Sequence, residues 1–148
     1  MSEKQSNILI GYLTEVRGDG MDARIAVEHA SETPIIKVGE EEMLAGQLGS
    51  YVIIRQAKIG VLALVFKMWE QDRFDRDGNR QTDRFISLIP VGEINKDGAF
   101  IRGVRHYPTP GAKVYAVGLK EINAIFSSYR EYEFFIGQLS AHKSYHLS

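Results

Sequence analysis

Short apolar segments separated by turn residues run through most of this 148-residue chain, and they constrain its fold more than any other feature. Residues 7–16, 23–28, 35–38, 51–56, 59–68, 84–93 and 113–117 are rich in Val, Ile or alternating apolar positions, as β-strands are. Leu119, Ile122 and Phe126 recur instead at helical spacing. The sequence therefore predicts an all-β fold: a small closed or nearly closed β-barrel of about six strands, with one short helix near the C-terminal end that plugs or caps it.

The segment 59–66 is apolar on both faces of its predicted strand. Alternation places four side chains on one face and three on the other: Ile59, Val61, Ala63 and Val65 against Leu62, Leu64 and Phe66. An antiparallel strand with one solvated face normally alternates apolar with polar residues. We therefore expect the outer face to be covered, either by lateral packing of barrels against one another or by a helix of the same chain.

Three features predict irregular structure. The densely charged segment 70–84 contains Asp77-Gly78-Asn79 and is expected to be a long exposed hairpin loop. The acidic run at residues 40–42 is expected to be a solvated loop or the start of a helix. Pro90 lacks a backbone donor, so it predicts an edge position or a bulge in its strand.

The segment Tyr107-Pro108-Thr109-Pro110-Gly111 predicts a rigid corner. Two prolines favour an extended backbone, and the glycine after them permits a sharp reversal. The bond between Tyr107 and Pro108 is a candidate for a cis peptide. The corner is expected to be a structural part of the barrel, with a ridge that contacts a partner as the alternative.

No motif in the chain predicts catalysis, a cofactor site or a metal site. A P-loop requires glycine followed by lysine, and no glycine here precedes one; Gly111-Ala112-Lys113 lacks the spacing and the hydroxyl. The segment 75–79 departs from a calcium loop because its glycine comes too early and Ile86 stands where a glutamate is needed. Cysteine and Gly-x-Ser-x-Gly are absent, and His142 and His146 have no third ligand nearby in sequence.

Charge argues against a strongly basic nucleic-acid binder, since 18 Lys and Arg oppose 19 Asp and Glu. Arginines in segment 70–84 alternate with aspartates, which favours a solvated hairpin tip over a nucleic-acid grip. The alternative function is a free-standing barrel that binds single-stranded nucleic acid, with Trp69, Phe74 and Tyr107 as stacking residues. The lack of cysteine, of a signal-peptide core and of a long apolar stretch predicts a cytoplasmic protein with no membrane partner.

Several segments carry a resemblance to a known family. They are Gly49-Ser50-Tyr51-Val52-Ile53-Ile54, Leu88-Ile89-Pro90-Val91-Gly92-Glu93, Phe100-Ile101-Arg102-Gly103-Val104, and residues 107–111 with Val114-Tyr115. In order and spacing they resemble the N-terminal β-barrel of bacterial HerA-like hexameric DNA-translocating ATPases, which is similar to the barrel of rotary ATP synthases (the HAS-barrel). The resemblance implies a barrel domain at residues 7–139 and, at residues 140–148, the start of a connection to an ATPase core that this chain does not contain.

The resemblance implies a non-catalytic module for oligomerisation and docking. In the whole protein it would form a hexameric ring around double-stranded DNA and receive a nuclease or a NAD-degrading effector subunit, as in anti-phage systems. ATP and magnesium would be needed only by the absent motor. The residues expected at subunit or partner interfaces are Ile59, Val61, Ala63, Val65, Arg73, Arg76, Tyr107, Pro108, Thr109 and Pro110.

Overall fold

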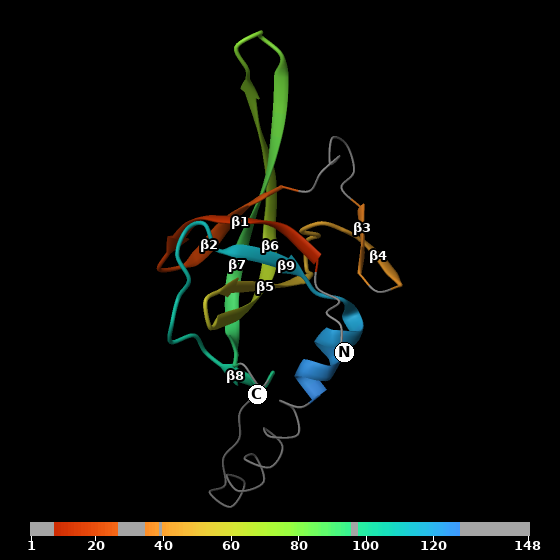
Figure 1. Cartoon of the computed structure of the whole chain (residues 1–148), viewed down its shortest axis with the longest axis vertical. Helices are drawn as coiled ribbons and strands as arrows, with labels where there is room; N and C mark the ends of the chain where they lie inside the picture. The colour runs from red at the N-terminus through yellow and green to blue at the C-terminus, as the bar shows by residue number, and fades with distance from the viewer. Residues whose placement is uncertain (1–7, 27–34, 39, 96–97, 128–148) are drawn as a thin grey trace, which may run out of the picture.

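The computed structural model describes residues 8–26, 35–38, 40–95 and 98–127, which are mostly β-strand (Figure 1). The strands in these ranges are β1 (Ile8–Arg17), β2 (Gly20–Ile25), β3 (Ile35–Val38), β4 (Glu41–Leu44), β5 (Tyr51–Gln56), β6 (Ile59–Phe74), β7 (Arg80–Ile94), β8 (Phe100–Arg102) and β9 (Lys113–Ala116). A helix described over residues 119–127 follows β9. The predicted all-β class and the helix near the C-terminal end are confirmed.

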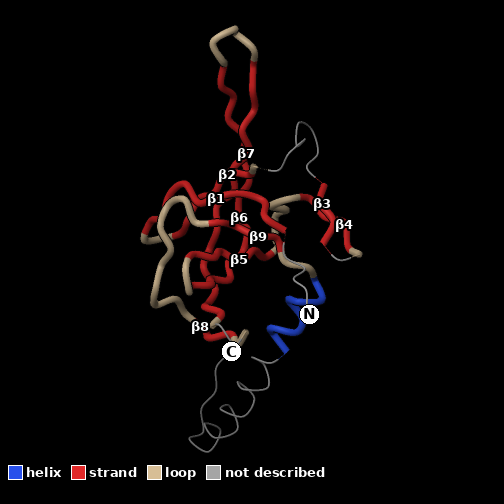
Figure 2. Tube along the Cα trace, in the orientation of Figure 1, coloured by secondary structure: helices blue, strands red, loops and turns tan. Residues whose placement is uncertain are grey.

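Six of the strands close into an antiparallel barrel. Their order is β2-β1-β9-β5-β6-β7, and β2 pairs back with β7 through Met21 and Leu88 among other pairs (Figure 2). Closure satisfies the backbone groups that an open sheet would leave at its edges. The barrel of about six strands is therefore confirmed. Strands β3 and β4 form a separate hairpin, and β8 pairs with the end of β7.

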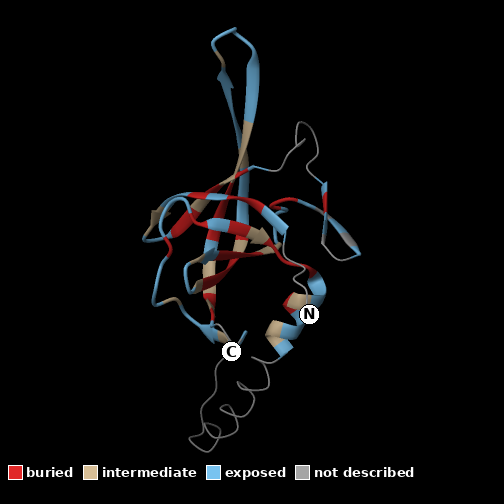
Figure 3. Cartoon of the chain, viewed as in Figure 1, coloured by how far each residue is buried: buried red, intermediate tan, exposed pale blue. Residues whose placement is uncertain are grey.

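The interior of the barrel is filled with aliphatic side chains. All six strands contribute a completely buried residue: Ile10, Met21, Ile54, Val61, Leu88 and Val114. The barrel wall is accordingly buried over much of its length in Figure 3. Burial of each such side chain contributes about 1.5–3 kcal/mol, so this core is the main source of stability in the fold.

The helix covers part of the outer wall. Ile53 on β5 and Leu62 on β6 point outward, yet they are 1% and 0% exposed because Val117 and Ile122 pack on them. The Phe126 ring meets the Tyr51 ring edge to face at 5.3 Å. The expected cover over the outer face is therefore supplied at Leu62 by the chain itself. This position gives no reason to expect a second copy.

Strands β6 and β7 continue past the barrel as a two-stranded arm, which Figure 1 shows projecting from it. The prediction of a long loop over residues 70–84 is wrong, because both strands run through that segment and only residues 75–79 turn. The Asp75 carboxylate accepts the amides of Asp77 and Asn79 at 2.9 and 2.8 Å, and Gly78 has a φ of 83°. These amides hold the pKa of Asp75 below its usual value. The predicted hairpin turn is confirmed.

Two smaller sequence predictions had different outcomes. The acidic run at residues 40–42 continues into strand β4, which pairs with β3. The prediction of a loop or helix start there is therefore wrong. Pro90 lies at a bulge: Leu62 faces Gly92 while Ala63 faces Pro90, leaving Val91 without an opposite residue. The predicted bulge is confirmed, and it falls between the end of the β2 pairing and the start of the β8 pairing.

Candidate interaction surfaces

Residues 103–112 form a lid that runs along one end of the barrel, beside the β1–β2 and β5–β6 turns (Figure 1). Val104 packs against the interior, and Pro108 is fully buried. The Ala112 amide donates to the Thr109 carbonyl at 3.1 Å, and Gly111 has a φ of 98°. Residues 109–112 therefore form a type II turn with Pro110 at its second position and Gly111 at its third. The structural corner is confirmed. The cis candidate is wrong, because the bond before Pro108 is trans.

Two polar side chains from the barrel strands hold the lid. Glu93 of β7 accepts the backbone amides of His106, at 2.8 Å, and of Arg105. These two amides hold the pKa of Glu93 below its usual value. Gln56 of β5 donates to the Thr109 hydroxyl at 2.7 Å and accepts the Thr109 amide at 2.9 Å. These side chains attach the lid in addition to its backbone hydrogen bonds with Leu13 and Val91.

We expect Glu93→Gln to lower the free energy of unfolding by about 1–2 kcal/mol at pH 7, because a neutral amide accepts the two backbone donors less strongly than a carboxylate. The depressed pKa makes this contribution present at neutral pH, and it is lost as pH falls through the folded-state pKa. Denaturant unfolding at pH 7 and at about pH 3 measures it. The matched control is Glu42→Gln on exposed β4; equal losses in both variants would contradict the role of Glu93.

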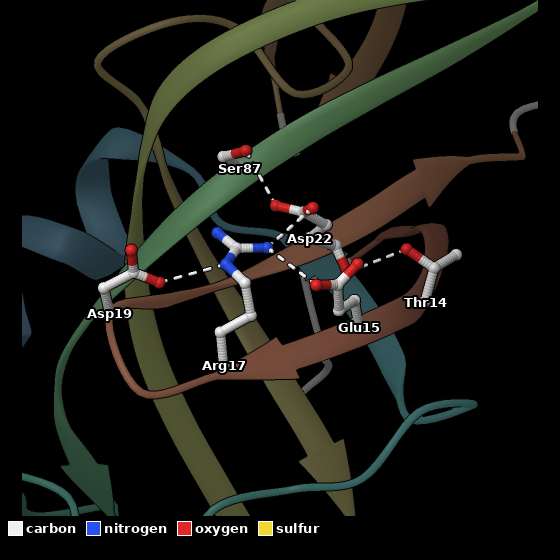
Figure 4. A network of polar contacts seen from close by, with 6 residues as sticks. All are labelled: Thr14, Glu15, Arg17, Asp19, Asp22 and Ser87. Carbon is white, nitrogen blue, oxygen red and sulfur yellow. Dashed lines mark hydrogen bonds and ion pairs between the residues drawn. The ribbon is translucent and has the colours of Figure 1, made fainter.

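A polar network joins the β1–β2 hairpin to β7 (Figure 4). Arg17 contacts Asp22 at 2.7 Å, Asp19 at 3.0 Å and Glu15 at 3.6 Å, and buried Ser87 donates to Asp22 at 2.7 Å. Hydrogen bonds to Asp22 and Asp19 raise the pKa of Arg17. The Ser87 hydroxyl donates to the Asp22 carboxylate, and Asp22 pairs with Arg17, so this cluster joins β7 to the β1–β2 hairpin.

Most charged side chains on the arm form cross-strand ion pairs. Arg84 meets Glu70 at 2.8 Å, and Arg80 meets Asp72 at 2.9 Å. Asp83 lies between Arg73, at 2.9 Å, and Arg24 of β2, at 3.1 Å. Partial burial opposes ionisation of Asp83, but the two arginines outweigh it, so its pKa lies below the usual value. Arginines paired in this way are poorly available to phosphate groups.

One apolar part of the outer wall lies outside the area that the helix covers. Leu64 of β6 lies opposite Ile89 of β7, which is 42% exposed, and Phe66 beside them is 43% exposed. Toward the arm, Trp69 stacks on Phe85 with ring centroids 5.4 Å apart. We call these five residues the β6–β7 strip. Phe66 and Ile89 are exposed and the other three are half-buried. An apolar strip of this kind is typical of a protein contact.

The predicted interface residues fall in three places. Val61, Ala63 and Val65 face the barrel interior and are at most 1% exposed, and half-buried Ile59 packs on the same core. The interface prediction for Val61, Ala63 and Val65 must be corrected, because a partner cannot reach inward-facing side chains of a closed barrel; for Ile59 it stays a prediction. Arg73 and Arg76 lie on the arm, and residues 107–110 belong to the lid. Leu64 and Phe66, on the other face of the same alternation, belong to the β6–β7 strip, but alternation alone did not show which face lies outside.

Other features of the described residues define no site. A depression of about 330 Å³ lies outside the barrel against the start of the helix, lined by mostly apolar residues such as Leu48, Tyr51 and Val117. No group of three His, Asp or Glu side chains lies close enough to hold a metal in the described ranges. In those same ranges no helix has the length and apolarity to cross a membrane. His29, His142 and His146, and the predicted connection at residues 140–148, fall outside them.

The fold and these surfaces define the class of protein: a small closed antiparallel β-barrel with a two-stranded arm and a helix-covered wall. No protein-family model matches the chain, and no curated protein is significantly similar to it in sequence. Barrels of this size occur in proteins with unrelated functions. The fold alone therefore does not identify the function of this chain.

Proposed function

We propose that this chain is a non-catalytic barrel for oligomerisation and partner docking, of the kind found in HerA-like DNA translocases. The observation that carries the proposal is the β6–β7 strip, which continues from the barrel wall onto the base of the arm. Phe66 and Ile89 each keep about two fifths of their surface in water although they lie next to a well-packed wall. Burial against a partner would favour association by a few kcal/mol.

The arm supports the same proposal. An isolated two-stranded hairpin is only marginally stable in water, yet β6 and β7 extend it to Phe74, which is 69% exposed. Beyond Val65 the outer edge of β6 pairs with no other strand in the described part of the chain. An open strand edge with an exposed aromatic near its tip is suited to contact with another polypeptide.

The setting proposed for this barrel follows from the resemblance. In a HerA-like protein, six copies would form a ring through repeated head-to-tail contacts, which close when the rotation between neighbours permits. The ring would surround double-stranded DNA and receive a nuclease or a NAD-degrading effector. ATP and magnesium would serve the motor domain of that protein.

The test is the mass of the chain in solution. We expect wild type to sediment above its 16.7 kDa monomer mass at tens of micromolar concentration. Phe66→Glu with Ile89→Glu should leave it monomeric, because two carboxylates would have to be desolvated in the contact. The control pair, Leu48→Glu with Ile101→Glu, changes exposed apolar residues elsewhere and should keep the wild-type mass. If wild type stays monomeric at about 500 µM, any self-association is weaker than an ordinary specific contact. That result would reject self-association.

A further inference from the structure

A row of outward-pointing side chains crosses the barrel wall near the lid. Arg55 of β5 lies directly opposite Lys113 of β9, and Lys113 lies opposite Tyr12 of β1. The neighbouring residues Ile54 and Val114 point into the core, so alternation turns Arg55 and Lys113 outward, and both are exposed. We call Arg55, Lys113 and Tyr12, with Lys58 in the adjoining β5–β6 turn, the basic row.

The central pair of this row brings two like charges together. Directly opposite residues on antiparallel strands have Cβ atoms about 5 Å apart, and like charges in such positions destabilise a sheet. Among the described residues neither Arg55, Lys58 nor Lys113 forms an ion pair. Gly60 lies opposite Arg55 on β6, and a Cβ there would be 3.3 Å from Arg55 Nη1, so the guanidinium lies over a position without a side chain.

Acidic side chains at this end of the barrel bind groups other than the basic row. The Glu93 carboxylate accepts two lid amides, and Glu15 and Asp19 contact Arg17. The row continues past Tyr12 to Arg24 of β2, which is bound to Asp83. Three cations in the row therefore lack a counterion among the residues that the structure describes. An anionic ligand would relieve their repulsion.

We propose that the basic row binds the phosphate backbone of single-stranded nucleic acid, an activity beyond the proposed association of barrels. Phosphates would lie between Arg55 and Lys113, and Lys58 would contact the next phosphate along the strand. Tyr12 is 39% exposed and Tyr107 of the lid is 46% exposed, so both rings are available to stack on unpaired bases. A duplex keeps its bases stacked internally and gains nothing from these rings. The contact lies on the barrel wall and not on the arm, where ion pairs occupy Arg73, Arg80 and Arg84.

The experiment measures fluorescence anisotropy of a labelled single-stranded oligonucleotide of about 20 nucleotides, titrated with the full chain. We expect a Kd of about 1–100 µM in 50 mM salt, with a log–log salt slope near −2 for three neutralised phosphates. Lys113→Glu should weaken binding at least tenfold, because it removes one cation and pairs a carboxylate with Arg55. Arg55→Glu with Lys113→Glu should abolish it, and Tyr12→Thr should weaken it several-fold by removing a stacking ring.

The matched control is Lys37→Glu with Lys120→Glu, which makes the same charge change at exposed residues on β3 and the helix. It should keep binding within about threefold of wild type, since neither residue belongs to the row. Lys113→Glu should unfold at the wild-type temperature or above, because it removes a like-charge pair. Weaker binding by this variant would therefore not be caused by unfolding. No binding in low salt, equal losses in the control, or equal affinity for a duplex would overturn the proposal. Monomeric and oligomeric chains can both be tested, so a failure of self-association would not affect this result.

Discussion

Replacement of Gly11 by alanine is expected to lower the free energy of unfolding by about 2–4 kcal/mol, the upper range for overpacking a closed structure. A Cβ at Gly11 would lie 2.1 Å from the carbonyl oxygen of Arg24 and 3.2 Å from the Cα of Ile25. Both are backbone atoms of β2, so no side-chain rotation relieves the overlap. Strands β1 and β2 would have to separate at a place where Gly11 also faces Val114 of β9.

The measurement is denaturant unfolding monitored by circular dichroism, with Gly18→Ala as the matched control. A Cβ at Gly18 meets nothing within 4 Å, so this variant should stay within about 0.5 kcal/mol of wild type. We expect Gly11→Ala to melt roughly 10 °C lower as well. If the two alanine variants were equally stable, the close approach of β1 to β2 would be incorrect.

Leu62→Ala is expected to cost about 2–4 kcal/mol, the usual range for a fully buried leucine. Leu62 is 0% exposed on the outer wall, where it packs with Ile53, Val117 and Ile122. Truncation leaves a cavity between the barrel and the helix, so faster amide hydrogen exchange should appear in residues 119–127 before the barrel core opens. Leu48→Ala, at a leucine 56% exposed, is the control and should change stability by less than about 0.5 kcal/mol.

The same variant separates two accounts of the outer wall. Because the helix of the same chain covers Leu62, Leu62→Ala should leave the solution mass unchanged as long as the barrel stays folded. Phe66→Glu with Ile89→Glu should do the reverse, changing the mass while leaving the core intact. A Leu62→Ala chain that keeps wild-type stability but dissociates would show that a second copy, and not the helix, covers this residue.

Local patterns predicted most of the barrel because a strand can be recognised from the alternation of a few neighbouring residues. Alternation in segments such as 51–56 and 59–68 depends on the two-residue repeat of a strand, and the Pro-Gly corner depends on the backbone preferences of those residues alone. The arm was missed for the opposite reason. Its charges are typical of a loop until Glu70 is paired with Arg84, 14 residues away, and only the strand register makes that pair.

The surfaces were harder to predict than the strands. Alternation divided residues 59–66 into two faces but gave no sign of which face the barrel would enclose, so Val61, Ala63 and Val65 were assigned outward. The basic row was not predicted either. Arg55 and Lys113 are 58 positions apart in sequence, and their opposition exists only because β5 and β9 are neighbours in the closed barrel.

By itself the sequence determined which segments extend, where the chain turns, and the lack of any recognisable catalytic motif, because these depend on neighbouring residues and on side-chain chemistry. Tertiary structure alone decided which face of β6 lies inside, that the chain's own helix covers Leu62, and that Arg55 meets Lys113. The physical reason is that burial and charge pairing depend on contacts between residues distant in sequence. Those contacts are specified only when the six strands close in one order.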